Sequence, residues 1–199
     1  MLKSLIIILF FVLLISCSTN TGNKNLTPVE TTLDNISSSF AVINKDSTHI
    51  VNYRVKKSRR YQDKGFSFNY ENETDSFTLN LDTSNGIYSG KFGESKIVHL
   101  DFAKANYYTI NGKIFKVLKL IGDRNETDGE FSLFLNPDFG LLISKSNTWR
   151  TAKVICPEKS DSSYAQLSVL LYRVQTDEDF FANPPVPALG KKITPPKFE

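Results

Sequence analysis

The sequence is poor in the side chains and motifs that most often carry catalysis or bind metals. Its two histidines, His49 and His99, lie fifty residues apart, and neither has a second His, Cys or paired carboxylate at metal-ligand spacing. It contains no Gly-x-Ser-x-Gly, Ser-x-x-Lys or phosphate-binding Gly-rich motif. Asp177 and Asp179 lie in a charged turn, where nothing local would push their pKa values apart. We therefore expect no catalytic residue, no metal site, no cofactor and no enzymatic activity.

The sequence also lacks an excess of charge of one sign. Twenty-four Lys and Arg residues stand against 21 Asp and Glu residues, which gives a net charge of +3. This balance argues against a nucleic-acid-binding protein. The single dense basic run, Lys56 to Arg60, is expected to be a solvated loop, or alternatively a contact to an anionic membrane surface. The acidic stretch from Asp123 to Glu130 is expected to be a hairpin turn, with weak calcium binding as the alternative.

The only long apolar run of the sequence lies at its N-terminus. Lys3 provides a positive charge, and the uncharged run from Leu5 to Ile15 is too short to span a bilayer but typical of a secretory signal. The run ends in Leu14-Ile15-Ser16-Cys17, which resembles the lipobox of bacterial lipoproteins, cleaved before the cysteine by signal peptidase II. The resemblance covers the first 17 residues. The alternative is an ordinary signal peptide or an anchor helix with a chance cysteine.

The lipoprotein resemblance implies a position in the cell. Cys17 would carry a diacylglyceryl group and an acylated amine, with fatty chains such as palmitate, and these would anchor the protein stably to a membrane. The polar stretch from Ser18 to Asn25 would be a flexible tether. No acidic run follows the cysteine, which favours a periplasm-facing position in a bacterial cell envelope. The choice between inner and outer membrane stays open.

Cysteine and proline usage defines the expected domains. With Cys17 lipidated, Cys156 has no intrachain partner, and we expect it to be a small buried residue that ends a strand. Five of the eight prolines lie between Pro184 and Pro196, where they exclude a regular strand. We expect a signal peptide in residues 1–16, a tether in 17–30, one β domain in 31–182, and a proline-rich tail in 183–199 that is disordered or binds a partner.

The middle of the sequence is typical of an antiparallel β protein. Residues alternate in polarity over 66–70 and 77–81, as expected for strands. Asn111-Gly112 predicts a tight hairpin over residues 106–120, and the Asn-Pro-Asp-Phe-Gly stretch at 136–140 predicts a second one. Residues 151–156 are expected to form a strand, residues 166–174 a strand or a helix, and residues 176–179 a capping box before a short turn.

Several of these strands are apolar on both faces, so both faces must be covered. Ile114 and Phe115 project to opposite sides of one strand, and Leu133 and Phe134 project to opposite sides of another. Either protein covers both faces, in a sandwich or packed barrel, or an apolar ligand covers one. The order of the Asn-Gly hairpin, Asn136 to Leu142, and Ser146 to Trp149 is similar to that in LolA-like half-barrel lipoproteins, which hold acyl chains.

The fold class expected from these patterns is mainly β: a single antiparallel sheet, either an open curved half-barrel or a sandwich, with few short helices. The expected function is binding or carrying an apolar ligand or lipid, with Phe115, Phe134, Leu142 and Trp149 as candidate ligand-binding residues. The alternative is a non-catalytic accessory or structural subunit of an envelope complex. The expected partners are the membrane, through the lipid, and an apolar ligand or an envelope protein, but no nucleic acid.

Overall fold

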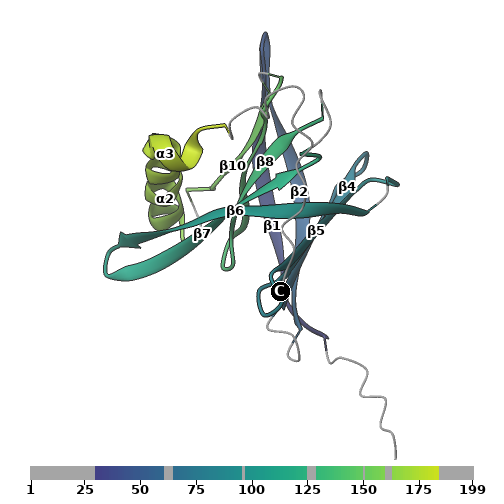
Figure 1. The fold of residues 1–199 in the computed structure, drawn as a ribbon, viewed down its shortest axis with the longest axis horizontal. Coiled ribbons are helices and arrows are strands. Elements are labelled where there is room, and N and C mark those ends of the chain that lie inside the picture. Colours follow the sequence, from purple (N-terminus) through teal and green to yellow (C-terminus); the bar gives the residue numbers. More distant parts are fainter. Residues whose placement is uncertain are drawn as a thin grey trace, which may run out of the picture.

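A computed structural model describes residues 30–60, 65–95, 97–124, 129–149, 151–159 and 163–183. In these ranges the chain forms ten strands followed by two helices (Figure 1). The expected signal peptide, most of the tether and nearly all of the proline-rich tail lie outside the described residues. The strands are β1 (Glu30–Asn44), β2 (Ser47–Arg60), β3 (Gly65–Glu71), β4 (Ser76–Asp82), β5 (Ile87–Phe92), β6 (Ile97–Ile110), β7 (Lys113–Gly122), β8 (Phe131–Asn136), β9 (Gly140–Ser146) and β10 (Ala152–Cys156).

The sheet is a closed antiparallel barrel in which each strand pairs with the next along the chain. The first and last strands close it, because Ser39 to Ile43 of β1 pair with Cys156 to Ala152 of β10. The prediction of a mainly β, single antiparallel sheet with few short helices is confirmed. The prediction of an open half-barrel or a sandwich is wrong. Local alternation of polarity identifies strands, but it carries no information on whether the first strand meets the last.

The barrel interior is filled by large side chains rather than left hollow. Residues that face each other on neighbouring strands share a side of the sheet, and Tyr70 and Phe77 form such a pair on β3 and β4. Their rings stack with centroids 4.3 Å apart, and the Tyr53 ring meets Phe77 edge-on at 5.4 Å. Phe40 of β1 packs against both tyrosines. This aromatic cluster joins strands from the beginning of the chain and fixes how they close.

Two predicted hairpins are confirmed. Asn111 and Gly112 both have positive φ angles, 50° and 78°, and they join β6 to β7 as a two-residue turn. In the turn between β8 and β9, the Asn136 side-chain oxygen accepts hydrogen bonds from the backbone N–H groups of Asp138 and Phe139. Gly140 then adopts a φ of 78° as β9 begins. The turn residues therefore set the register within two strand pairs, β6–β7 and β8–β9.

Two helices cover the outer face of the barrel over β6 to β9. They are α2 (Tyr164–Thr176) and α3 (Glu178–Phe181), and Figure 1 shows them on one side of the barrel beside the long β6–β7 hairpin. Residues 166–174, expected as a strand or a helix, are helical. The expected capping box at 176–179 is present in part, because Asp177 caps α3 by accepting a hydrogen bond from the Phe180 N–H at 3.1 Å.

Polar contacts hold these helices on the sheet. The Asp177 carboxylate accepts hydrogen bonds from Asn106 Nδ2 at 2.7 Å and Tyr108 Oη at 2.9 Å. Lys119 Nζ donates to the Phe180 carbonyl at 3.0 Å, at the C-terminal end of α3. The second cover required by the two-sided strands is therefore supplied by the chain itself.

Candidate ligand-binding site

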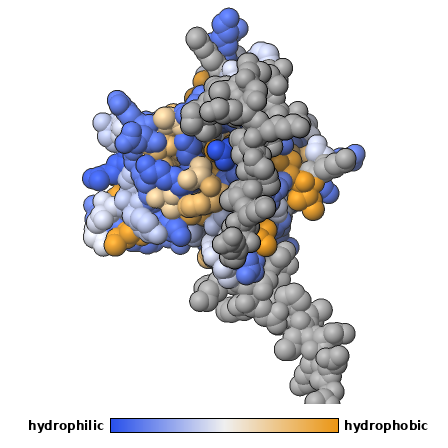
Figure 2. All heavy atoms as spheres, viewed as in Figure 1, coloured by the Kyte–Doolittle hydropathy of each residue, from blue (hydrophilic) through white to orange (hydrophobic). Residues whose placement is uncertain are grey.

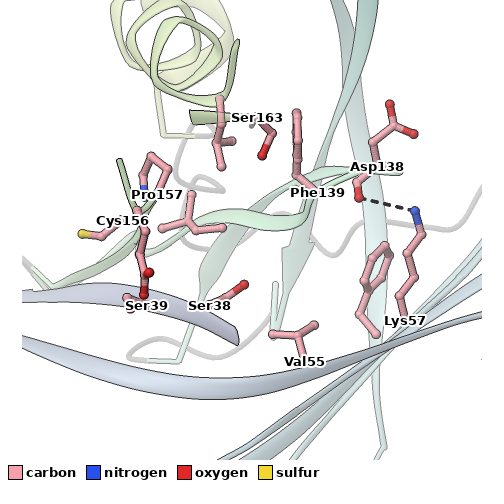
Figure 3. Close-up of a pocket in the computed structure, with 13 residues that line it drawn as sticks. Ser38, Ser39, Val55, Lys57, Asp138, Phe139, Cys156, Pro157 and Ser163 are labelled. Carbon is pink, nitrogen blue, oxygen red and sulfur yellow. Dashed lines mark hydrogen bonds between the residues drawn. The ribbon is translucent and has the colours of Figure 1, made fainter. Parts of the chain in front are cut away.

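The barrel has a mouth at the end where β10 stops. β10 has only five residues and pairs with β1 over Ser39 to Ile43, so among the described strands nothing pairs with the preceding part of β1 on that side. A cavity of about 230 Å³ lies there, between β1, β2, β3, the β8–β9 turn and the start of α2. We call this cavity the mouth. Figure 3 shows Val55 of β2 on one side of it and Ser163, which precedes α2, on the other.

One wall of the mouth is apolar and rigidly packed. Val55, Phe68, Ile155 and Leu167 line it and are otherwise almost completely buried. Phe139 completes the wall from the β8–β9 turn, with its ring stacked on Phe115 at 5.7 Å between centroids. A preformed apolar wall of this kind is typical of small-molecule sites.

The other wall of the mouth carries a cation. Lys57 follows Tyr53 and Val55 on the inward face of β2, and its Nζ donates a hydrogen bond to the Asp138 carbonyl oxygen at 3.3 Å (Figure 3). The same Nζ lies 5.3 Å and 5.6 Å from the ring centroids of Phe66 and Phe68. The ammonium group is therefore held at the edge of the apolar wall, where it places a positive charge beside the cavity.

Hydroxyl and acidic groups complete the lining. The lining includes Ser38, Ser39, Ser163, Glu158 and Asp138, although the Ser39 hydroxyl donates a hydrogen bond to Asn52 Oδ1 at 2.8 Å. The Asp138 carboxylate forms an ion pair with Lys113 at 3.2 Å. The mouth thus combines an apolar wall with a small number of polar groups.

The structure separates the four residues predicted to bind ligand. Phe134 and Leu142 are completely buried, and Phe134 packs against Phe180 and Phe181 of α3. Phe115 is also buried and reaches the mouth only as the support of Phe139. Trp149 lies in the β9–β10 turn at the opposite end of β10 and is 61% exposed. These residues therefore do not line one common cavity, and the predicted lipidation residue, Cys17, lies outside the described residues.

The residues that do line the mouth were missed by sequence analysis, although a signal was present. The run from Lys56 to Arg60 was expected to be a solvated loop, but it belongs to β2. Alternation from Tyr53 through Val55 places Lys57 on the inward face, and this signal was available in the sequence. Ile155 and Leu167 come from β10 and α2, and the fold brings them beside Val55 and Phe68, which are about a hundred residues away in the sequence.

The other candidates from the sequence were the histidines, the possible calcium loop and Cys156. His99 lies 3.7 Å from Asp101 on an exposed part of β6, and within the ranges described no group of three or more His, Cys, Asp or Glu could hold a metal. Asn125 to Asp128 of the possible calcium loop lie outside those ranges. Cys156 ends β10, as predicted, but is half-buried rather than buried, and its thiol faces the Val154 carbonyl.

Comparison with known proteins adds no assignment. No family model matches this sequence, and no curated protein matches it significantly. Among the helices described, none is long and apolar enough to cross a membrane.

Proposed function

We propose that this protein is a non-catalytic, lipid-anchored envelope protein that binds a small amphipathic ligand in the mouth of its barrel. The observation that carries the proposal is the pairing of an apolar wall, formed by Val55, Phe68, Phe139 and Ile155, with the Lys57 ammonium at its edge. A ligand with a short apolar body and an anionic head fits both. The interior beyond the mouth is filled by aromatic side chains, which favours a short ligand over a full-length acyl chain.

The binding test compares octanoate with octanol by isothermal titration calorimetry. We expect octanoate to bind, and Lys57→Met to weaken octanoate binding at least about tenfold, because a charge-assisted hydrogen bond contributes about 1.5–3 kcal/mol. Octanol binding should change little in the same variant. Lys91→Met, at an exposed position of β5, is the control and should bind octanoate like the wild type. Failure of both octanoate and octanol to bind would contradict the proposal.

The anchor is tested separately. Cys17→Ala should abolish incorporation of a labelled fatty acid in a bacterial host, because the cysteine thiol is the proposed attachment point. Cys156→Ser is the matched control and should incorporate as much label as the wild type. Equal labelling of the wild type and Cys17→Ala would contradict lipidation at this residue.

One observation favours the alternative of an accessory subunit. Tyr107 and Ile114 are each 65% exposed on neighbouring strands of the long β6–β7 hairpin. Tyr107 pairs with Lys116, and Ile114 pairs with Thr109, so these side chains share one face of the hairpin. Tyr108 and Phe115 lie on the opposite face, where Tyr108 donates a hydrogen bond to Asp177 at the start of α3. Purification of the protein from membranes with a stoichiometric partner that is lost in Tyr107→Ala/Ile114→Ala would support this alternative.

A further inference from the structure

A second candidate site lies at the end of β10 remote from the mouth. The β9–β10 turn carries Trp149, whose indole is 61% exposed, and the turn that joins β1 to β2 lies beside it because Ile43 pairs with Ala152. Trp149, Thr148 and Thr151 together form what we call the Trp149 platform. Two hollows share these three residues, one of about 410 Å³ that reaches Lys45 and one of about 450 Å³ that reaches Lys145.

The backbone under the platform is held in place by hydrogen bonds. Ser146 Oγ accepts hydrogen bonds from the N–H groups of Thr148 and Trp149, at 3.2 Å and 2.8 Å. The Asn147 side chain is fixed on both sides, by Ser132 Oγ at 2.9 Å and Glu130 Oε1 at 2.7 Å. An exposed tryptophan on a preordered turn loses little conformational entropy on binding a ligand, which favours a binding role over a packing role.

The chemistry around the indole indicates the class of ligand. The face of an indole carries negative charge density and attracts the C–H groups of a flat, weakly polar ring face. Thr148 and Thr151 line both hollows together with Trp149, so a ligand ring that also carries hydrogen-bonding groups around its edge would suit them. Sugar rings have both properties.

The charged residues around the Trp149 platform indicate which kind of saccharide would bind there. Lys45 lines one hollow and Lys145 lines the other, and no Asp or Glu is among the residues that line either hollow in the part of the chain described here. We propose that the Trp149 platform binds an acidic polysaccharide, with one sugar ring stacked on the indole and carboxylates of the chain near Lys45 and Lys145. This site is independent of the mouth, because the length of β10 separates Trp149 from Cys156.

The sequence offers a direct readout, because Trp149 is the only tryptophan of the chain. We would titrate the protein with tetragalacturonate and record tryptophan emission. The expected result is a saturable blue shift, with at least tenfold weaker binding of the neutral tetrasaccharide maltotetraose. Octanoate, which is proposed to bind at the mouth, should leave the emission maximum unchanged, so failure at one site is distinguishable from failure at the other.

Variants test the same interaction by calorimetry. Trp149→Ala should weaken tetragalacturonate binding at least tenfold, while Tyr172→Ala, which removes a similarly exposed aromatic ring from α2, should bind like the wild type. Lys45→Gln should weaken binding several-fold and reduce its dependence on salt. Lys145 is left intact because its Nζ donates to the Phe181 carbonyl at the end of α3. Circular dichroism would show that each variant folds.

Several results would overturn the proposal. Absence of any emission shift with tetragalacturonate would do so, as would wild-type affinity in Trp149→Ala. Equal binding of tetraglutamate would show simple charge attraction without stacking. Tighter binding of a thymidine tetranucleotide would assign the platform to single-stranded nucleic acid, and a shift only with anionic phospholipid vesicles would assign it to a membrane surface.

Discussion

Two turn glycines have the same φ angle but different surroundings. Gly112 and Gly140 both have a φ of 78°, which is strained for any other residue. A Cβ on Gly112 would meet nothing within 4 Å, whereas on Gly140 it would lie 2.4 Å from Tyr70 Oη and 3.0 Å from the Phe68 ring. Substitutions at the two positions therefore distinguish the cost of backbone strain alone from the cost of strain combined with a steric clash.

We predict that Gly112→Ala lowers the free energy of unfolding by about 1 kcal/mol, the cost of a non-glycine residue at positive φ. Gly140→Ala should lower it by about 2–4 kcal/mol, because overpacking against Tyr70 adds to the same strain. Urea unfolding midpoints of the two variants measure the difference. Equal losses would show that the contact with Tyr70 does not constrain this turn.

The Tyr70 hydroxyl is also the hydrogen-bond acceptor for a buried backbone N–H group. It accepts a hydrogen bond from the Leu141 N–H at 2.7 Å in the buried core, and burial raises the pKa of Tyr70 above its usual range. Tyr70→Phe should cost about 1–3 kcal/mol, because a buried N–H loses its acceptor. Tyr107→Phe, at an exposed position, is the control. A Tyr70→Phe midpoint indistinguishable from the wild type would contradict this role.

At the scale of single residues, sequence analysis predicted backbone conformation better than it predicted which residues line a ligand site. The positive φ angles of Asn111 and Gly112 follow from local chemistry, so the turn was predictable. The burial of Phe134 under Phe180 was not, because that contact joins residues far apart in sequence. Phe115, Phe134 and Leu142 were chosen for being apolar on a two-sided strand, a pattern that is the same for a packed face and a ligand cavity.

At the scale of elements, Asp177 couples the two helices to the barrel. Burial alone would raise the pKa of its carboxyl group, but hydrogen bonds from Tyr108 and Asn106 outweigh burial and hold the pKa below its usual range. Because the folded state lowers this pKa, the carboxylate contributes stability above the unfolded pKa of about 3.9. That contribution is lost as the pH falls through the folded pKa.

We predict that Asp177→Asn lowers the free energy of unfolding at pH 7 by about 0.5–1.5 kcal/mol, since it weakens hydrogen bonds to a charged acceptor that solvent partly screens. The difference from the wild type should shrink as the pH falls below about 4. Urea unfolding between pH 7 and pH 2.5 measures it, and hydrogen exchange should report faster opening of α2. Glu94→Gln, at an exposed turn, is the control, and a pH-independent difference would contradict this assignment.

Element identity was predictable where a periodic pattern or a turn signal was strong. The strands over 66–70 and 77–81 alternate cleanly, and the structure has them as β3 and β4. Residues 166–174 were left open between a strand and a helix, although Leu167, Leu170, Leu171 and Val174 recur at the spacing of a single helix face. The structure bears out that spacing, because these four residues form the buried side of α2.

At the scale of the whole molecule, closure of the sheet is the property that sequence patterns left undecided, since a packed barrel was only one of the alternatives. Closure brings β10 to β1, although more than a hundred residues separate them. It also creates the mouth, because the short β10 covers only part of β1. A direct test of closure is therefore also a test of the geometry on which the proposed ligand site depends.

The last prediction concerns a disulfide across the closing pair. Ala41 and Val154 are direct partners on β1 and β10, and Cα atoms in such pairs lie about 4.5–5.5 Å apart, within disulfide range. With Cys17 and Cys156 replaced by Ser, the variant Ala41→Cys/Val154→Cys should oxidise readily. The oxidised form should be stabilised by about 2–4 kcal/mol, because the bond closes a long loop in the unfolded chain.

The matched control pairs Ala41→Cys with Asp101→Cys on β6, which lies several strands away around the barrel. This control should stay reduced in the folded protein under the same oxidant. Thiol titration, peptide mass mapping and urea midpoints with and without reductant measure both variants. If the sheet were open between β1 and β10, the two pairs would behave alike: neither would crosslink in the native state, and reductant would change neither midpoint.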